Sequence, residues 1–411
     1  MPLLKCLGEL MLYLVAWLTD SALILFVFSV TRLLADQSAS PWTLGTLGAV
    51  FFLSSALSNV LGGRLSDRIG RKTVSILGGL ALVISLSVLL VFERDTWRLF
   101  ISYAATGLSV GHIYPPVIAM LSEGVTQKVA SFRFLMFGIA FNLGILSGQV
   151  GGGWLYDHLG HDAPLWTAIG MAGLTVVCLA LYRRDRRRTS DADDGGGEVR
   201  SSEKQTVTDD ERRSARQFVR LAWLANFAGM FSMSMLWFLF PALAVSLGLP
   251  AEQHGVVLGV GRATVIGIYI GMHLLTGWHH RFRYSMAAQL VGLVGMLLVC
   301  VAETPVGLAF GVLLLSTLLG YNYFASLFYN RAGHVDDDKG AAFGLNEAFL
   351  AFGASGGSLM GGWAATEWGA RAPFQLAAMV IAAALLVQWP MLRRWRQEPG
   401  GDGETLNANQ L

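Results

Sequence analysis

Apolar residues run along this chain in stretches of about 20, separated by short polar segments. A helix needs about 20 predominantly apolar residues to cross the hydrocarbon core of a bilayer. Twelve stretches have that length: 10–32, 43–63, 73–92, 98–121, 132–153, 164–182, 217–246, 254–277, 284–302, 305–329, 341–364 and 372–392. The pattern therefore predicts an all-α membrane protein with twelve transmembrane helices, six on each side of a polar break.

That break has the sequence "RRDRRRTSDADDGGGEVRSSEKQTVTDDERRSARQ". It is highly charged, rich in Gly, Ser and Thr, and almost free of large apolar residues, which is typical of a disordered linker. We expect four regions: a six-helix half at 1–182, a cytoplasmic linker at 183–216, a second six-helix half at 217–396 and a disordered cytoplasmic tail at 397–411.

Basic residues indicate how the chain sits in the membrane, because cytoplasmic loops carry an excess of Lys and Arg. The linker and the loops on its side contain many of them: Arg64, Arg68, Arg71, Lys72, Lys128, Arg183, Arg184, Arg186, Arg187, Arg188, Arg281, Arg283, Arg331, Lys339, Arg393, Arg394 and Arg396. Opposite loops such as "DHLGHDA" and "SLGLPAEQ" contain none. We therefore predict a multi-pass protein of the cell membrane with both termini in the cytoplasm.

Composition supports this class and excludes others. Of the 411 residues, 54% are hydrophobic and 14% charged, whereas soluble domains carry about a quarter charged residues. A net charge of +2 does not favour nucleic-acid binding. No P-loop or HExxH pattern occurs, so we expect neither an enzyme nor a cofactor. We interpret the segment "YDHLGHD", residues 156–162, as a solvated loop rather than a metal site, and the three cysteines as inert thiols.

The two halves repeat each other in sequence. At a constant offset of 209, residues of the segment around "GQVGGGWLYDHLGHDAPLW" match residues of the segment around "GSLMGGWAATEWGARAPFQ". The matched positions are Gly144, Gly148, Gly152, Gly153, Trp154, Gly160, Ala163 and Pro164 with Gly353, Gly357, Gly361, Gly362, Trp363, Gly369, Ala372 and Pro373, and Gly45 matches Gly255 at offset 210. Parallel six-helix repeats of this kind are typical of transporters whose site lies between the halves.

The loop "GGRLSDRIGRK", residues 62–72, is the densest charge cluster between two apolar stretches. It resembles the loop signature of the major facilitator superfamily (MFS), Gly-x-Leu-x-Asp-Arg-x-Gly-Arg-Lys. The matching residues are Gly63, Leu65, Asp67, Arg68, Gly70, Arg71 and Lys72. With six plus six spans and a basic linker, the resemblance covers nearly the whole chain and implies the MFS fold.

The resemblance also implies that this loop is a cytoplasmic gate, which latches the halves together when the site faces outwards. We expect Asp67 to lie near the positive N-terminal end of the eleventh span, close to Gly340. Arg68 or Arg71 is expected to pair with Glu123. The alternative is that the loop only sets topology.

Three glycines and a further acid complete the expected gate. Gly62 and Gly63 are expected to let the second span approach a neighbour, and Gly70 to permit a tight turn. Glu347, near the start of the eleventh span, is interpreted as a gate or capping residue.

Asp20 is the first candidate for a functional polar residue inside the membrane. It lies near the middle of the first span, where an ionisable side chain is costly and indicates function. A desolvated carboxyl group suits a residue that loads and releases a proton, and Asp20 resembles the acidic residue of proton-coupled drug antiporters of the superfamily. His112 in the fourth span is a second proton-coupling candidate. The alternative is a structural Asp that pairs with Thr19 or a neighbouring helix.

Arg262 is the second buried charge, with Tyr269 on the same face of its helix. A buried guanidinium requires an anion, and the candidates are Asp20, Glu347 or a substrate. The other predicted cavity residues are polar side chains of the fifth, seventh and tenth spans: Asn142, Gln149, Asn226, Asn322 and Tyr323. The superfamily resemblance implies that the fifth span packs on the eighth, so we assign the stripe of Gly144, Gly148 and Gly152 to that contact.

These observations favour a secondary active transporter that moves a small organic solute by alternating access, with proton-coupled export as the first expectation. The alternatives are proton-coupled uptake of an anionic metabolite bound by Arg262, or a transporter-fold membrane sensor or assembly protein. The expected partners are a small-molecule substrate, protons and the lipid bilayer, with no nucleic acid, and we expect a monomer.

Overall fold

The computed structural model describes residues 2–91, 96–123, 127–182, 209–275, 277–279, 281–333 and 339–397, and every regular element within these ranges is a helix. The first half comprises α1 (Pro2–Asp36), α2 (Pro41–Ile69), α3 (Arg71–Val91), α4 (Thr96–Ser122), α5 (Gln127–Leu159) and α6 (Ala163–Leu181). The second comprises α8 (Asp209–Phe238), α9 (Phe240–Ser246), α10 (Ala251–Leu274), α11 (Phe282–Val301), α12 (Pro305–Gly333), α13 (Lys339–Trp368) and α14 (Ala372–Gln397).

These helices account for the twelve expected spans. Eleven helices in the described ranges are long and apolar enough to cross a membrane. The remaining span is α13, which is 30 residues long and packs against α2, α8 and α14. The predicted all-helical membrane fold is confirmed.

Two boundaries differ from the prediction. The seventh span is divided at Leu239 into α8 and α9, because Pro241 has no N–H to continue the hydrogen-bond ladder and its ring crowds the preceding turn. Residues 209–216, expected in the linker, form the first two turns of α8. Residues 183–208 and 398–411 lie outside the described ranges.

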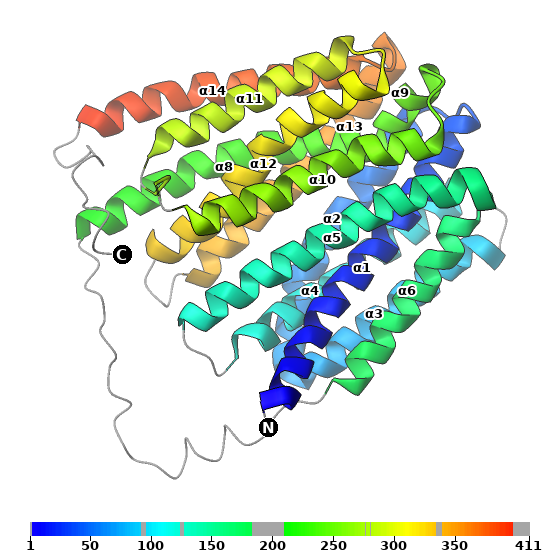
Figure 1. Cartoon of the computed structure of the whole chain (residues 1–411), viewed down its shortest axis with the longest axis horizontal. Helices are drawn as coiled ribbons and strands as arrows, with labels where there is room; N and C mark the ends of the chain where they lie inside the picture. The colour runs from blue at the N-terminus through cyan, green and yellow to red at the C-terminus, as the bar shows by residue number, and fades with distance from the viewer. Residues whose placement is uncertain are drawn as a thin grey trace.

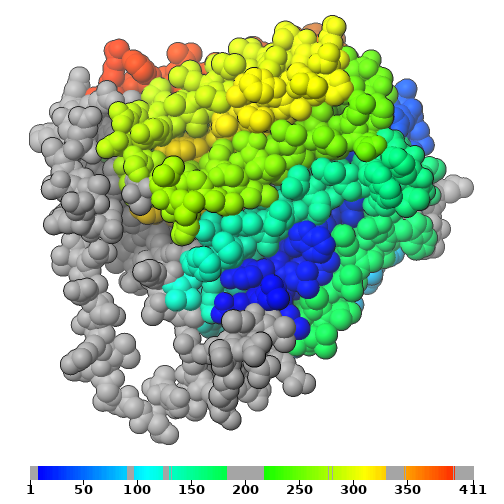
Figure 2. All heavy atoms as spheres, viewed as in Figure 1, coloured from blue at the N-terminus to red at the C-terminus, as the bar shows by residue number. Residues whose placement is uncertain are grey.

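The helices lie in two adjacent groups, and successive long helices run in opposite directions (Figure 1). We call the end where α1 begins and α6 stops the linker end, and the opposite end the far end. The halves meet along two helix pairs, α5 with α10 and α2 with α13. In the space-filling view, side chains of α5 and α10 meet along much of the visible face (Figure 2).

The glycine stripe of α5 does not face the partner half as expected. A Cβ on Gly144 would lie 2.6 Å from the Trp17 carbonyl oxygen of α1, and one on Gly148 would lie 2.8 Å from Ile24. The stripe therefore brings α5 close to α1, inside the first half. The matched stripe of α13 does the same in the second half, where a Cβ on Gly357 would meet the Phe231 carbonyl oxygen of α8 at 2.1 Å.

Different glycines bring the two halves together. A Cβ on Gly153 of α5 would lie 2.3 Å from the Ala251 carbonyl oxygen of α10, and one on Gly255 of α10 would lie 2.3 Å from the Gln149 carbonyl oxygen. Gly45 of α2 and Gly362 of α13 make the equivalent contact. All four lie towards the far end, and they are the positions that the sequence repeat relates to each other. The far-end contact between the halves is therefore pseudo-symmetric.

We predict that Gly153→Ala separates the halves at the far end, since overpacking of a tight contact costs about 1–3 kcal/mol. The measurement is maleimide labelling of a cysteine placed at Thr31, a buried far-end residue, in a background without native cysteines. Labelling is expected to become several-fold faster.

Gly151→Ala is the matched control, because a Cβ there meets no described atom within 4 Å. Equal labelling of the two variants would contradict the proposed role of the contact.

Candidate functional site

A cluster of polar side chains lies between the halves, near the middle of the helices. Asp20 of α1 is 1% exposed and has Tyr114 of α4 and Arg262 of α10 as electrostatic neighbours. Arg262 donates from Nη1 to Asn142 Oδ1 of α5 at 3.4 Å, and its guanidinium lies 4.9 Å from the centre of the Trp237 ring of α8. We call these five residues the central cluster. Both halves contribute to it.

Asp20 and Arg262 are neighbours without direct contact. Within the described part of the chain, no ion pair of 4.0 Å or less joins them. The Tyr114 hydroxyl is the nearest hydrogen-bonding neighbour of Asp20, but Asp20 Oδ2 and Arg262 Nη2 are both buried and have no hydrogen-bond partner within 3.5 Å among the described residues. Leaving such groups unpaired typically costs about 1–3 kcal/mol each, and more when they are charged. The central cluster is thus poorly satisfied on its own, as expected of groups that act on a proton or a ligand.

Three further predicted residues gather beside this cluster on its linker-end side. Tyr269 of α10 is an electrostatic neighbour of Arg262, and its ring lies 5.3 Å from that of Phe324. Tyr323 of α12 interacts with Tyr269 and with Glu347 of α13, whose side chain is exposed. These residues all come from the second half.

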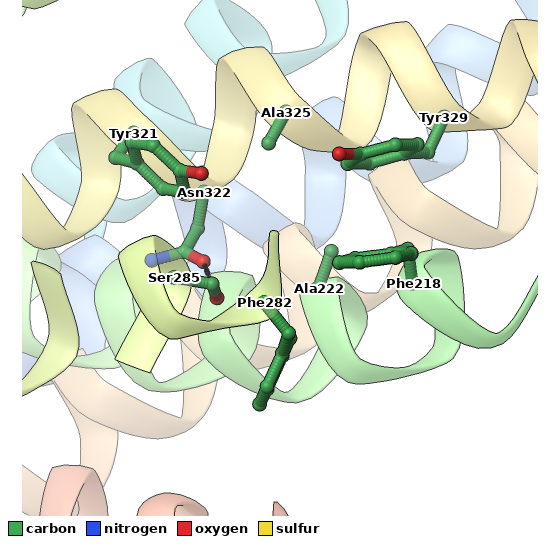
Figure 3. Close-up of a pocket in the computed structure, with 8 residues that line it drawn as sticks. All are labelled: Phe218, Ala222, Phe282, Ser285, Tyr321, Asn322, Ala325 and Tyr329. Carbon is green, nitrogen blue, oxygen red and sulfur yellow. Dashed lines mark hydrogen bonds between the residues drawn. The ribbon is translucent and has the colours of Figure 1, made fainter. Parts of the chain in front are cut away.

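Other candidates lie elsewhere. His112 Nδ1 is 2.8 Å from Ser58 Oγ of α2, inside the first half. Asn322 accepts a hydrogen bond from Ser285 Oγ of α11 at 2.5 Å, inside the second half. Figure 3 shows Asn322 beside a small pocket lined by residues of α8, α11 and α12. Asn226 is buried on α8. Buried polar side chains serve helix packing as well as function, and sequence position alone did not separate the two.

The charged segment of residues 62–72, expected as a loop, is helical except at Gly70, and its glycines have different roles. Gly62 allows close approach, since its Cβ would lie 2.3 Å from the Gly111 carbonyl oxygen of α4. Gly63 was expected to do the same but faces no described atom within 4 Å. Gly70 has φ +99°, a conformation that glycine adopts readily, and it separates α2 from α3.

Two basic residues of this segment, at the start of α3, link α3 to α4 and α6 within the first half. Arg71 Nη1 lies 3.3 Å from Glu123 Oε1, so the expected ion pair is present, and it also donates to the Ala119 carbonyl at 3.1 Å. Lys72 Nζ donates to the Ala180 and Tyr182 carbonyls at the C-terminal end of α6, at 2.8 and 2.7 Å.

Asp67 and Arg68 are exposed at the end of α2. The contacts of the residues at the start of α13, around Gly340, lie outside what the structure describes. The expected contact of Asp67 there therefore stays a prediction.

The far end has a polar network that sequence reasoning missed. Arg32 of α1 forms an ion pair with Asp36 at 3.1 Å, and Tyr156 of α5 donates to Asp36 at 2.6 Å. Arg32 Nη2 also donates to the Leu249 carbonyl of the second half at 2.9 Å. The spacing of four between Arg32 and Asp36 was a signal of an ion pair on one helix face.

Asp157 of α5 provides a second polar link between the halves at the far end. Its carboxylate accepts hydrogen bonds from the Ala251 N–H at 3.2 Å and the Glu252 N–H at 2.7 Å, at the first turn of α10. A carboxylate is favoured there because the helix N-terminus is positive and its N–H groups lack intrahelical partners. Together, Arg32, Asp36, Tyr156 and Asp157 with the Leu249–Glu252 segment form what we call the far-end clamp.

Comparison with known proteins decides the family. A model of the Major Facilitator Superfamily matches residues 10–335. The chain belongs to this superfamily.

Several MFS proteins resemble the chain over most of its length. It is 26% identical over 373 residues to the inner membrane transport protein YajR of Escherichia coli K12, covering 86% of this chain and 76% of YajR. It is 24% identical over 372 residues to multidrug resistance protein MdtG of Escherichia fergusonii, covering 86% and 85%.

A solved structure has the same fold. A bacterial homologue of the human lysosomal transporter Spinster, in an inward-facing and unoccupied conformation, superposes with a TM-score of 0.69 at 14% identity, covering 94% of this chain and 95% of that one.

We predict that Asp157→Asn weakens the far-end clamp of this MFS protein. The amide keeps one acceptor but loses the charge at the α10 N-terminus, an effect of about 0.3–1 kcal/mol or more. Labelling of a cysteine at Thr31 is expected to rise about two- to fivefold.

Glu303→Gln is the control, since Glu303 is also an exposed far-end carboxylate and takes no part in the clamp. If the clamp holds the far end closed, Glu303→Gln is labelled at the wild-type rate. Unchanged labelling in Asp157→Asn would argue against this role of the clamp.

Proposed function

We propose that this MFS protein is a proton-coupled secondary transporter that exports a small organic solute, with Asp20 as the proton carrier. The single observation that supports this most is the position of Asp20. It is a buried carboxyl group between two halves that both contribute to its surroundings. Membership of the superfamily supports secondary transport in general, and the relative MdtG is named as a multidrug resistance protein.

In this proposal the two ends of the molecule open in turn. We assign the linker end to the cytoplasm. Arg71, Lys72 and Arg393 lie there, and cytoplasmic segments of membrane proteins carry an excess of Lys and Arg. Arg98 and Arg371 lie at the far end. Basic residues are therefore concentrated at the linker end, but they are not confined to it as the sequence analysis expected. The structure has the far-end clamp formed. The gate of Asp67 and Arg68 belongs to the opposite state, in which the linker end is closed.

Proton loading is coupled to this movement through charge. Asp20 is on the first half and Arg262 on the second. The attraction between a carboxylate and a guanidinium depends on their separation and is strong where water is excluded. Movement of one half against the other therefore changes how readily Asp20 binds a proton, and protonation in turn changes which arrangement is favoured.

The side chains around the central cluster indicate the kind of solute. Trp237 stacks on Phe52 with 5.9 Å between ring centroids, and Tyr114 packs against Phe141 with 5.6 Å between ring centroids. Aromatic walls with a few convergent polar groups suit an amphipathic organic compound. Export of such a compound against its gradient, driven by inward movement of protons, is the function that this arrangement supports best.

We predict that Asp20→Asn abolishes gradient-driven transport, because an amide cannot exchange a proton. The measurement uses proteoliposomes with an imposed pH gradient and a fluorescent amphipathic dye as probe. Dye accumulation is expected to fall at least tenfold, while gradient-independent dye exchange persists. Asp20→Glu keeps the ionisable group and retains part of the coupling.

Coupling through Asp20 is wrong if dye movement in the wild type ignores the pH gradient, or if Asp20→Asn still follows it.

Arg262 favours a second candidate, proton-coupled uptake of an anionic metabolite. Its Nη2 atom has no hydrogen-bond partner in the described chain, and no described carboxylate lies within 4.0 Å of the guanidinium. A buried guanidinium with a free donor nitrogen and no carboxylate partner is well suited to bind a carboxylate.

We predict that Arg262→Gln lowers affinity for benzoate at least tenfold relative to its neutral methyl ester, if an anion is the solute. Arg262→Lys keeps the charge without the planar fork and is expected to lie between. Isothermal titration with purified protein measures both ligands. Equal loss for the anion and the ester would assign Arg262 to internal packing and remove this second candidate.

A further inference from the structure

A recess lies between the halves on the far-end side of the central cluster. Its walls come from four helices, two in each half: Ile24, Val27, Phe28 and Thr31 of α1, Gln149 of α5, Trp237 of α8, and His254 and Leu258 of α10. Along α1 these residues lie one to three turns beyond Asp20, so the recess continues the path from the central cluster towards the far-end clamp.

Four polar atoms around this recess have no hydrogen-bond partner in the part of the chain that the structure describes. They are Gln149 Oε1, Trp237 Nε1 and both ring nitrogens of His254. His254 is 0% exposed and Gln149 is 2% exposed, so bulk water does not satisfy them. More than nine in ten buried polar groups in proteins are paired. Four unpaired atoms around one small recess are therefore unusual.

His254 is held firmly despite its unpaired nitrogens. Its ring stacks on Phe28 of α1, with 4.6 Å between centroids and 27° between planes. The Phe240 ring of α9 lies 5.3 Å away on a tilted plane. Phenylalanine would make the same contacts without leaving nitrogens unpaired, so packing alone does not explain a histidine here.

The chemistry of the four atoms defines what they can recognise. The Trp237 indole donates a hydrogen bond, the Gln149 carbonyl accepts one, and a neutral His254 ring does one of each. None of the lining residues carries a carboxylate, ammonium or guanidinium group. The set therefore matches an uncharged group that both donates and accepts, such as a hydroxyl or a carboxamide.

The size of the recess sets a second limit. The cavity volume of the recess is about 10 Å³, which is roughly enough for one water molecule. A hydroxyl group fits, whereas a whole aromatic ring does not. The rest of a ligand must then lie outside the recess, against the aromatic walls of the central cluster, which shares Trp237 with it.

We propose that this recess is a substrate subsite that binds the hydroxyl group of an aromatic solute through His254, Gln149 and Trp237. The inference deepens the proposed function by naming a substrate class, namely hydroxylated aromatic compounds. It rests on the proposed solute path, but its test measures equilibrium binding without any gradient. It therefore fails or succeeds independently of proton coupling at Asp20.

The test compares matched ligands that differ by one hydroxyl group. The anionic pair is 4-hydroxybenzoate and benzoate, and the neutral pair is methyl 4-hydroxybenzoate and methyl benzoate. Isothermal titration uses the purified full chain, as wild type and as His254→Phe and Gln149→Leu. In the wild type the hydroxyl is expected to improve affinity about tenfold in at least one pair. Each variant is expected to remove that advantage while leaving the affinity of the non-hydroxylated ligand within about twofold.

Thermal unfolding of the ligand-free protein distinguishes a binding role from a structural role, because loss of a structural residue lowers the Tm. Replacing an unsatisfied buried polar side chain by an apolar one of similar shape is neutral or stabilising, so the Tm of both variants is expected to stay level or rise. Gln289→Leu is the control, because Gln289 is equally buried but exchanges two hydrogen bonds with Gln388, at 2.8 and 3.0 Å. Its Tm is expected to fall, with the hydroxyl preference kept.

Three results would overturn the proposal. The first is that the hydroxyl group does not improve affinity in either pair, or that no probe binds. The recess would then be a site for water alone. The second is that the advantage survives in both variants. The third is that His254→Phe and Gln149→Leu lower Tm as Gln289→Leu does, which would make the two residues structural.

Discussion

Close backbone contact between the halves at the far end is the constraint on which the rest of the structure depends. Two glycine pairs, Gly153 with Gly255 and Gly45 with Gly362, bring α5 against α10 and α2 against α13. No other residue fits there without displacing a backbone. Because the pairs are related by the repeat, the halves meet on two equivalent seams, and polar residues on α1, α5, α8 and α10 are brought together between them.

Polar groups buried in this molecule fall into two kinds. The first kind is paired, as in the reciprocal amide bonds of Gln289 and Gln388 and the Ser285–Asn322 bond, all inside the second half. The second kind has a polar atom without a partner in the described chain. Arg133 and Trp223 are examples inside the halves. Five more such residues lie between the halves: Asp20, Gln149, Trp237, His254 and Arg262. Unpaired buried groups reduce stability, and proteins retain them where function requires it. The five residues between the halves form a connected group, in the central cluster and the adjoining recess, where we place the solute path.

Residue type and depth in the membrane identified Asp20, Arg262 and Asn142, because a polar side chain in the middle of an apolar helix is conspicuous. The same criterion selected His112 and Asn322, which lie in contacts within the halves. It passed over His254, near the start of α10, and the clamp residues Arg32 and Asp157 near helix ends, where polar residues are ordinary. Depth along a helix is readable from sequence, but the face that meets a neighbour depends on packing.

The sequence by itself determined the fold class, the number of spans, the two-fold repeat and the loop that places the chain in its superfamily. These follow from hydrophobic length and from short motifs, which are local properties of the chain. Only the tertiary structure decided that the α5 stripe faces α1, that Gly153 and Gly362 join the halves, and that Asp157 caps α10. Each is a contact between residues far apart in sequence, and side-chain shape and backbone approach choose among partners that the sequence leaves equivalent.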